Sequence, residues 1–255
     1  KGYMSLALIL KSEFMKYKRS ALYKVAFAIP ILSVVLFFIN LHLRFDWLTS
    51  GKKLEQAIEM GIGGKLGILI YTNHLGTLWF FFLLTLIVLL SVIVNYTEYS
   101  ENTWKQILSR PVDRWKIYFS KWVVIFTFTT IAIIINTLGL IAMKNIFKVD
   151  GSYILIVKYF VFQFATALGV ISIQQFISCY IKNSLMAAGI GFAAVMSAYM
   201  MAQSEILGNI FPYSCFLRAM PFEGGSDSQI AAIFGVASCV IWLSIGILEF
   251  KNREV

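Results

Sequence analysis

The sequence contains few charged residues and very little cysteine. Only 14% of its 255 residues are Asp, Glu, Lys or Arg, whereas an ordinary soluble domain has roughly 25%. The three cysteines form no CxxC pair, which argues against both a disulfide framework and a cysteine-based zinc site. Apolar residues are abundant instead, at 59% of the chain. This balance excludes a disordered chain or a typical soluble enzyme and predicts a protein embedded in a membrane.

The sequence also lacks the common catalytic and nucleotide-binding motifs. It contains no GxxxxGK[ST] phosphate-binding loop, no HExxH, no GxSxG and no cluster of His, Cys and carboxylate residues. We therefore expect neither a catalytic residue nor a bound metal or cofactor, and an intramembrane enzyme is disfavoured. The two histidines, His42 and His74, fall at the ends of apolar runs, where a position at the membrane interface explains them without chemistry.

Six uncharged runs are long enough to cross a bilayer, which takes about 20 apolar residues in a helix. Their apolar character is continuous and does not alternate as it does in the strands of a membrane barrel. The sequence therefore predicts an all-α membrane protein with a single transmembrane domain over residues 1–255. The expected spans are roughly 24–43, 75–96, 120–143, 157–180, 183–204 and 228–249.

Basic residues are distributed unequally between the two sides that six spans define. Fourteen of the 22 Lys and Arg residues fall on the side of both termini, together with six acidic residues. The other side has eight basic and seven acidic residues. Because Lys and Arg concentrate on the cytoplasmic side of membrane proteins, we expect both termini in the cytoplasm of a multi-pass protein of a bacterial plasma membrane. Attraction to anionic lipid explains the net charge of +9, so no nucleic-acid partner is expected.

Inside the spans the polar residues are almost all neutral. Gln163 and Gln174 can either form hydrogen bonds between helices or line a translocation path. Met196 and Met200 lie in a span rich in small residues and can either contribute an adaptable apolar path or simply pack against lipid and neighbouring helices. We take all four as candidate pore-lining residues. The lack of charge at mid-depth implies that energy for any transport enters from another subunit.

Three stretches outside the spans have distinct patterns. Residues 4–19 predict an amphipathic helix lying on the cytoplasmic leaflet, with a charged side that includes Glu13, Lys16, Lys18 and Arg19. In the loop after the second span, a Glu101–Lys105 pair and Pro111 predict a short helix. This helix can dock on a soluble partner or pack against its own bundle. The uncharged run 206–217 is too short to span and predicts an outer re-entrant or interfacial segment.

A family resemblance of the loop favours docking on a soluble partner over packing against its own bundle. Its string Asn102-Thr103-Trp104-Lys105, continuing to Leu108-Ser109-Arg110-Pro111-Val112-Asp113-Arg114, resembles the coupling-helix region of ABC-2 permeases. The N-terminal Glu13-Phe14-x-Lys16-x-Lys18-Arg19-Ser20 resembles the same family, and Ile210-Phe211-Pro212-Tyr213-Ser214 resembles its lantibiotic-immunity subgroup. Length, span number and predicted orientation agree with the family over essentially the whole chain.

The resemblance implies half of a translocation pore without an ATPase site of its own. The expected partners are two copies of a cytoplasmic ABC ATPase, which hold ATP and Mg, and a second permease, either a copy or a paralogue. The interfacial helix would contact the ATPase together with Glu98, Glu101, Asn102, Thr103, Trp104, Lys105 and Leu108. The implied cargo is a cationic amphipathic peptide expelled from membrane lipid. Another hydrophobic cargo, such as a peptide antibiotic, lipid or drug, and a non-transporting scaffold or sensor remain alternatives.

Overall fold

The computed structural model describes residues 5–18, 20–59, 61–100, 112–221 and 227–252. Within these ranges every regular element is a helix and there is no strand. Six helices are long and apolar enough to cross a membrane, which confirms the predicted number of spans. They are α2 (Ala21–Thr49), α5 (Trp79–Ser100), α7 (Arg114–Ile146), α8 (Tyr153–Tyr180), α9 (Ser184–Met201) and α12 (Asp227–Asn252).

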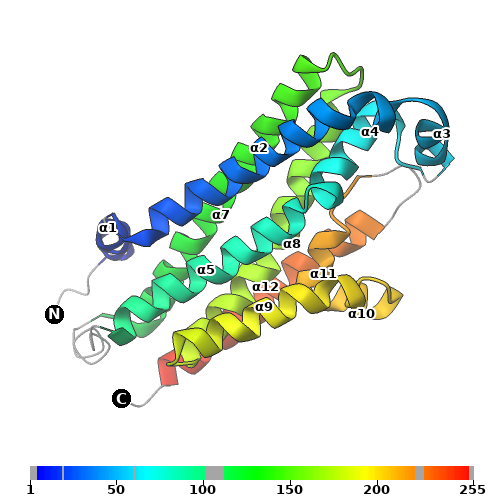
Figure 1. The fold of residues 1–255 in the computed structure, drawn as a ribbon. Helices are drawn as coiled ribbons and strands as arrows, with labels where there is room; N and C mark the ends of the chain where they lie inside the picture. The colour runs from blue at the N-terminus through cyan, green and yellow to red at the C-terminus, as the bar shows by residue number, and fades with distance from the viewer. Residues whose placement is uncertain (1–4, 19, 60, 101–111, 222–226, 253–255) are drawn as a thin grey trace.

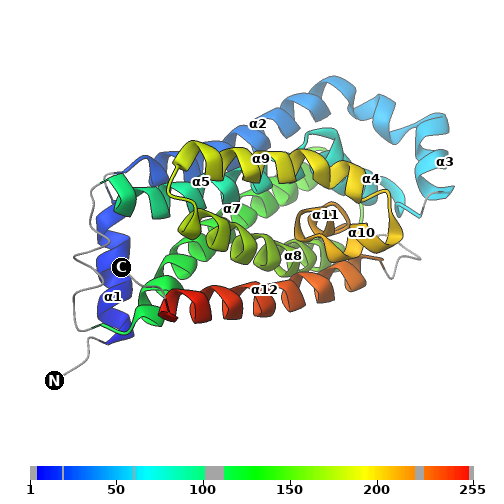
Figure 2. The ribbon, with the colours of Figure 1, turned by 90° about the horizontal axis from the view of Figure 1, so that it is seen from below.

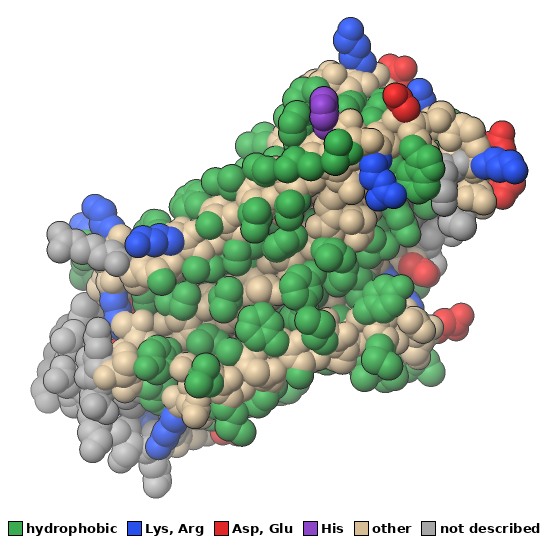
Figure 3. Space-filling view, in the orientation of Figure 1, with side chains coloured by type: hydrophobic (Ala, Val, Ile, Leu, Met, Phe, Trp, Pro, Cys, Tyr) green, Lys and Arg blue, Asp and Glu red, His purple; other side chains and the backbone are tan. Residues whose placement is uncertain are grey.

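The long helices form an elongated bundle with different structures at its two ends. Helix α1 (Leu6–Tyr17) lies across one end, close to both chain termini, and we call this the terminal end (Figures 1 and 2). Helices α3 (Gly51–Glu59) and α4 (Gly64–Tyr71) lie at the opposite, distal end. Between the two ends the visible surface is largely apolar, and the charged side chains gather at the ends (Figure 3). This distribution suits a bundle surrounded by lipid.

Local sequence explains where several helices begin. The Ser5 side chain accepts a hydrogen bond from the backbone N–H of Leu8 and so caps α1. Ser152 caps α8 in the same way, through the N–H of Ile154. Asn183 caps α9 by accepting from the N–H groups of Leu185 and Met186. Such caps satisfy backbone donors that have no partner inside the helix, which fixes the break between the fourth and fifth spans.

Helix α5 occupies the centre of the bundle. It has the largest buried share of the six, 56% over its most apolar window, whereas α2, α9 and α12 have between 22% and 28%. Helices α8 and α12 pack closely at Gly235, where an added Cβ would lie 2.6 Å from the Cα atom of Thr166. A side chain there would force the two helices apart, so the crossing depends on this glycine.

The entry into α5 differs from the expected start of the second span near Leu75. The chain leaves α4 through one turn of π-helix, η1 (Thr72–Gly76), and α5 begins at Trp79 after Leu78, which has a positive φ of 59°. The interpretation of His74 as an interfacial residue is wrong, because its side chain is fully buried. The π-helical turn places Asn73 and His74 in the protein interior, whereas His42 on α2 is exposed.

The run 206–217 forms two short helices, α10 (Glu205–Ile210) and α11 (Pro212–Leu217), at the distal end. Every residue of α11 is buried. Arg218 fixes the fold of this segment, because its guanidinium donates hydrogen bonds to the carbonyl oxygens of Ala202 at 2.8 Å and Ser204 at 3.0 Å. It also donates to Oδ1 of Asn209 at 3.0 Å. The re-entrant position of this segment stays a prediction.

Candidate functional site

Five side chains from three helices, α1, α5 and α7, meet at the terminal end, and we call them the charge cluster. Lys121 of α7 lies at its centre, with its Nζ atom 2.8 Å from Oε1 of Glu98 on α5 and 3.3 Å from Oε2 of Glu13 on α1. The side chains of Lys121 and Glu98 have no exposed surface. Lys16 of α1 forms a second ion pair with Glu98. Tyr17 of α1 completes the cluster.

The Tyr17 hydroxyl connects α1 to both of its neighbours. It lies 2.9 Å from Oε2 of Glu13 and 3.0 Å from the carbonyl oxygen of Val94, and it accepts a hydrogen bond from Lys121 at 3.2 Å. Burial raises the pKa of the Tyr17 phenol above its usual range, Glu13 and Glu98 raise it further, and Lys121 opposes them. The hydroxyl therefore stays protonated and acts as a neutral hydrogen-bonding group.

The charge cluster contains two cations and two carboxylates, so it is electrically balanced. Buried charges are costly to remove from water, and the cost is offset only when each charge retains a partner in good geometry. Here the partners come from α1, α5 and α7, so the pairs persist only while these three helices keep their relative positions. Chemically, the arrangement is suited to holding three elements together.

Sequence reasoning missed the charge cluster because it treated Lys121 as a charge at a span boundary. A signal for it was present. Glu98 ends one span and Lys121 begins the next, so in an antiparallel pair of helices they lie at similar depth. Glu98, which the resemblance assigns to the ATPase contact, lies within α5 and has a buried side chain.

The other predicted coupling residues, Glu101, Asn102, Thr103, Trp104, Lys105 and Leu108, lie outside the described residues. The described chain stops at Ser100 and resumes at Val112, and both flanking helix ends belong to the terminal end (Figure 1). Of the charged residues assigned to the N-terminal helix, Glu13 and Lys16 join the charge cluster, Lys18 is exposed and Arg19 is outside the described residues. The surface location of α1 on a membrane stays a prediction.

The four candidate pore-lining residues do not come together in this chain. Gln163 and Gln174 are fully buried and bond to neighbouring helices: Nε1 of Trp79 donates to Gln163 at 2.6 Å, and the Tyr213 hydroxyl donates to Gln174. Met196 and Met200 are 63% and 73% exposed on α9. The glutamines therefore connect helices, and the methionines belong to an outward-facing surface.

A second buried polar group, the distal polar cluster, comprises Asn73 and His74 of η1, Asn136 of α7 and Tyr159 of α8. The amides of Asn73 and Asn136 donate to each other at 2.8 and 3.1 Å. Nε2 of His74 lies 3.0 Å from the carbonyl oxygen of Phe216, and Nδ1 lies 2.9 Å from the Tyr159 hydroxyl. Because a carbonyl only accepts, we assign the imidazole proton to Nε2, and Nδ1 accepts from Tyr159.

Neutral His74 fits this environment. Burial lowers the pKa of His74 to about 3, although the carbonyl groups of Phe216 and Leu217 act in the opposite direction. The distal polar cluster is therefore uncharged near neutral pH. Among the described residues no group of three or more His, Cys, Asp or Glu side chains could hold a metal ion.

Comparison with known proteins gave a match to a family model. A family model described as "ABC-2 family transporter protein" matches residues 9–198, well over half of the chain. No curated protein and no solved structure matches. The matched region contains α2 to α8, most of α9 and all five residues of the charge cluster.

Proposed function

Because the chain belongs to the ABC-2 transporter family, we propose that it is the permease subunit of an ATP-driven exporter in a bacterial plasma membrane. Members of this family are membrane transport components that usually work with a cytoplasmic ABC ATPase. Two copies of that ATPase supply ATP hydrolysis with bound Mg, and a second permease, a copy or a paralogue, completes the pore. The excess of basic residues on the terminal side supports cytoplasmic termini.

The charge cluster is the observation that carries the proposed coupling to the ATPase. It ties α1 to the end of α5 and the start of α7, the two helices that flank residues 101–111. A force applied to 101–111 or to α1 therefore acts on all three helices together. In this proposal Glu101, Trp104 and their neighbours contact the ATPase, and Glu98 acts from inside the bundle as a positioning residue.

The proposed cargo is a cationic amphipathic peptide, as in lantibiotic immunity. Two features support it: the resemblance of residues 210–214 to lantibiotic-immunity permeases, and the exposed methionine surface of α9. Met196 and Met200 offer flexible apolar side chains that can adapt to a large, variable ligand. A neutral apolar surface also suits the apolar face of such a peptide, while its charged face remains in water or at lipid headgroups.

The test is reconstitution of the chain with its ATPase in vesicles, measuring ATP hydrolysis and export of a labelled cationic amphipathic peptide. Trp104→Ala should reduce peptide export at least tenfold while the chain stays folded, because the ring is expected to fill the ATPase groove. Tyr153→Ala removes an exposed aromatic ring at the distal end and should leave export unchanged. Normal export by Trp104→Ala would overturn the coupling assignment. Export of lipid or drug, but not of peptide, would overturn the cargo.

A further inference from the structure

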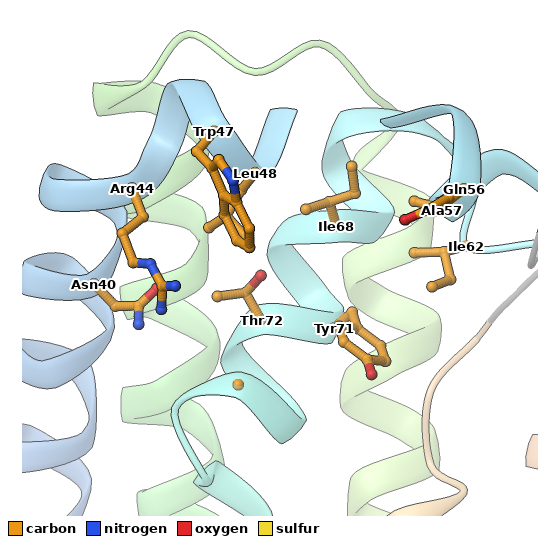
Figure 4. A pocket seen from close by; sticks show the side chains of 11 residues that line it. Asn40, Arg44, Trp47, Leu48, Gln56, Ala57, Ile62, Ile68, Tyr71 and Thr72 are labelled. Atoms are coloured by element: carbon orange, nitrogen blue, oxygen red, sulfur yellow. The ribbon is translucent and has the colours of Figure 1, made fainter. Parts of the chain in front are cut away.

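A pocket of about 330 Å³ opens at the distal end between α2, α3, α4 and η1 (Figure 4). Arg44 and Trp47 of α2 face Ile68 and Thr72 across it. Its remaining lining includes Ile62, between α3 and α4. The pocket is thus mostly apolar, with a few polar groups contributed by α2, α3 and η1, which is the composition expected of a small-molecule site.

Arg44 gives the pocket its charge. Among the described residues that line the pocket it is the only ionised one, and it is exposed. In the described part of the chain no carboxylate pairs with it, and its guanidinium lies 4.9 Å from the centre of the Trp47 ring. A guanidinium has five N–H donors in a fork that matches the oxygens of a phosphate. The pocket therefore favours an anionic group beside Arg44, and Asn40 and Thr72 provide further polar contacts.

The sequence around the pocket indicates its depth in the membrane. Arg44 immediately follows the uncharged run 25–43 of α2, so it lies where the apolar core of the bilayer gives way to headgroups. Trp47 and Tyr71, both partly exposed in the lining, are aromatic residues with a polar atom, which concentrate at this depth. An occupant at this level meets phosphate on one side and acyl chains on the other.

We propose that this pocket binds a phospholipid from the leaflet at the distal end, with the headgroup phosphate on Arg44. Its volume accommodates a headgroup and the first part of the acyl chains, and the rest of the chains remain in the bilayer. Ile62 and Ile68 contact the apolar part, and the phosphate accepts hydrogen bonds from Arg44. The site is a lipid site on the permease itself and does not depend on the identity of the exported cargo.

The test is lipid binding to the purified full chain in detergent, followed by native mass spectrometry with phosphatidylglycerol as the probe. Arg44→Gln should weaken the first bound phosphatidylglycerol about tenfold, because it removes a charge-assisted hydrogen bond. Arg44→Lys should recover part of that affinity. Lys65→Gln is the matched control, since Lys65 is an exposed cation on α4 that does not line the pocket, and it should bind as the unaltered chain does.

Three further measurements make the outcome decisive. Diacylglycerol, which lacks the phosphate, should bind at least tenfold more weakly than phosphatidylglycerol. Inorganic phosphate should not displace the bound lipid, because it cannot occupy the apolar wall. A phosphatidylglycerol with a photoreactive acyl chain should label residues 62–72. Equal binding by Arg44→Gln with an unchanged melting temperature, equal binding of diacylglycerol, displacement by phosphate or labelling elsewhere would each overturn the proposal.

Discussion

The charge cluster and the distal polar cluster are both buried, but the cost of burying their polar groups is offset by different interactions. At the terminal end, Lys121 and Glu98 remain ionised groups that neutralise each other inside the protein. At the distal end, Asn73, Asn136 and His74 form a network in which every member is neutral. Separating the partners of a buried ion pair leaves uncompensated charges, which costs more free energy than separating the partners of a neutral hydrogen bond.

This contrast gives the two ends different mechanical roles. The charge cluster joins three helices where α1 and the flanks of residues 101–111 meet, so loss of one charge disturbs all three. The distal polar cluster holds η1 against α7, α8 and the backbone of α11 by individually weaker bonds. We therefore expect substitutions at the terminal end to cost more stability than equivalent substitutions at the distal end.

The largest effect is expected from Lys121→Met, which keeps the approximate shape of the side chain and removes its charge. Glu13 and Glu98 then face each other without the central cation, and breaking a buried ion pair costs about 3–5 kcal/mol. Thermal unfolding in detergent measures this loss. Lys116→Met on the same helix removes a cation whose pair with Asp113 and whose contact with the Trp115 ring lie near the surface, and it should cost under about 1 kcal/mol. Equal losses for the two variants would contradict the role of the charge cluster.

Asn136→Leu should give an intermediate loss of about 2 kcal/mol, because the Asn73 amide keeps its burial but loses its reciprocal partner. The same unfolding assay applies. Thr137→Val is the control, since in the described part of the chain the Thr137 hydroxyl bonds only to the Ile133 carbonyl of its own helix, and it should cost less than about 0.5 kcal/mol. A loss for Asn136→Leu as large as that for Lys121→Met would remove the distinction between the two ends.

A smaller, pH-dependent effect is expected from His74. Its pKa is lowered from 6.5 to about 3 by burial, so the unfolded chain binds a proton that the folded chain does not. The resulting stability is complete above pH 6.5 and is lost as pH falls from there towards 3. Between about pH 7.5 and pH 5.5 the loss is about 1.4 kcal/mol. His74→Gln should remove this part of the pH dependence, whereas substitution of exposed His42 should leave it; an identical pH profile in His74→Gln contradicts the assignment.

The sequence was sufficient for the six long apolar helices, because long uncharged runs have no other stable arrangement in lipid. It was insufficient for the entry into α5, since the π-helical turn that buries Asn73 and His74 depends on packing against α7, α8 and α11. The same limit applies to the site. Ending each predicted span at a charged residue assumes that the charged side chain faces water. Lys121 does not, because its side chain is fully buried.

The central claim is that the charge cluster transmits force between the ATPase and the bundle, and a charge-balanced variant tests it most directly. Lys121→Met combined with Glu98→Gln removes one cation and one anion together and leaves Glu13 and Lys16 to balance each other. The measurement is peptide exported per ATP hydrolysed in vesicles containing the chain and its ATPase. We predict a folded variant whose export per ATP falls at least tenfold while hydrolysis continues; an unchanged ratio would contradict the claim.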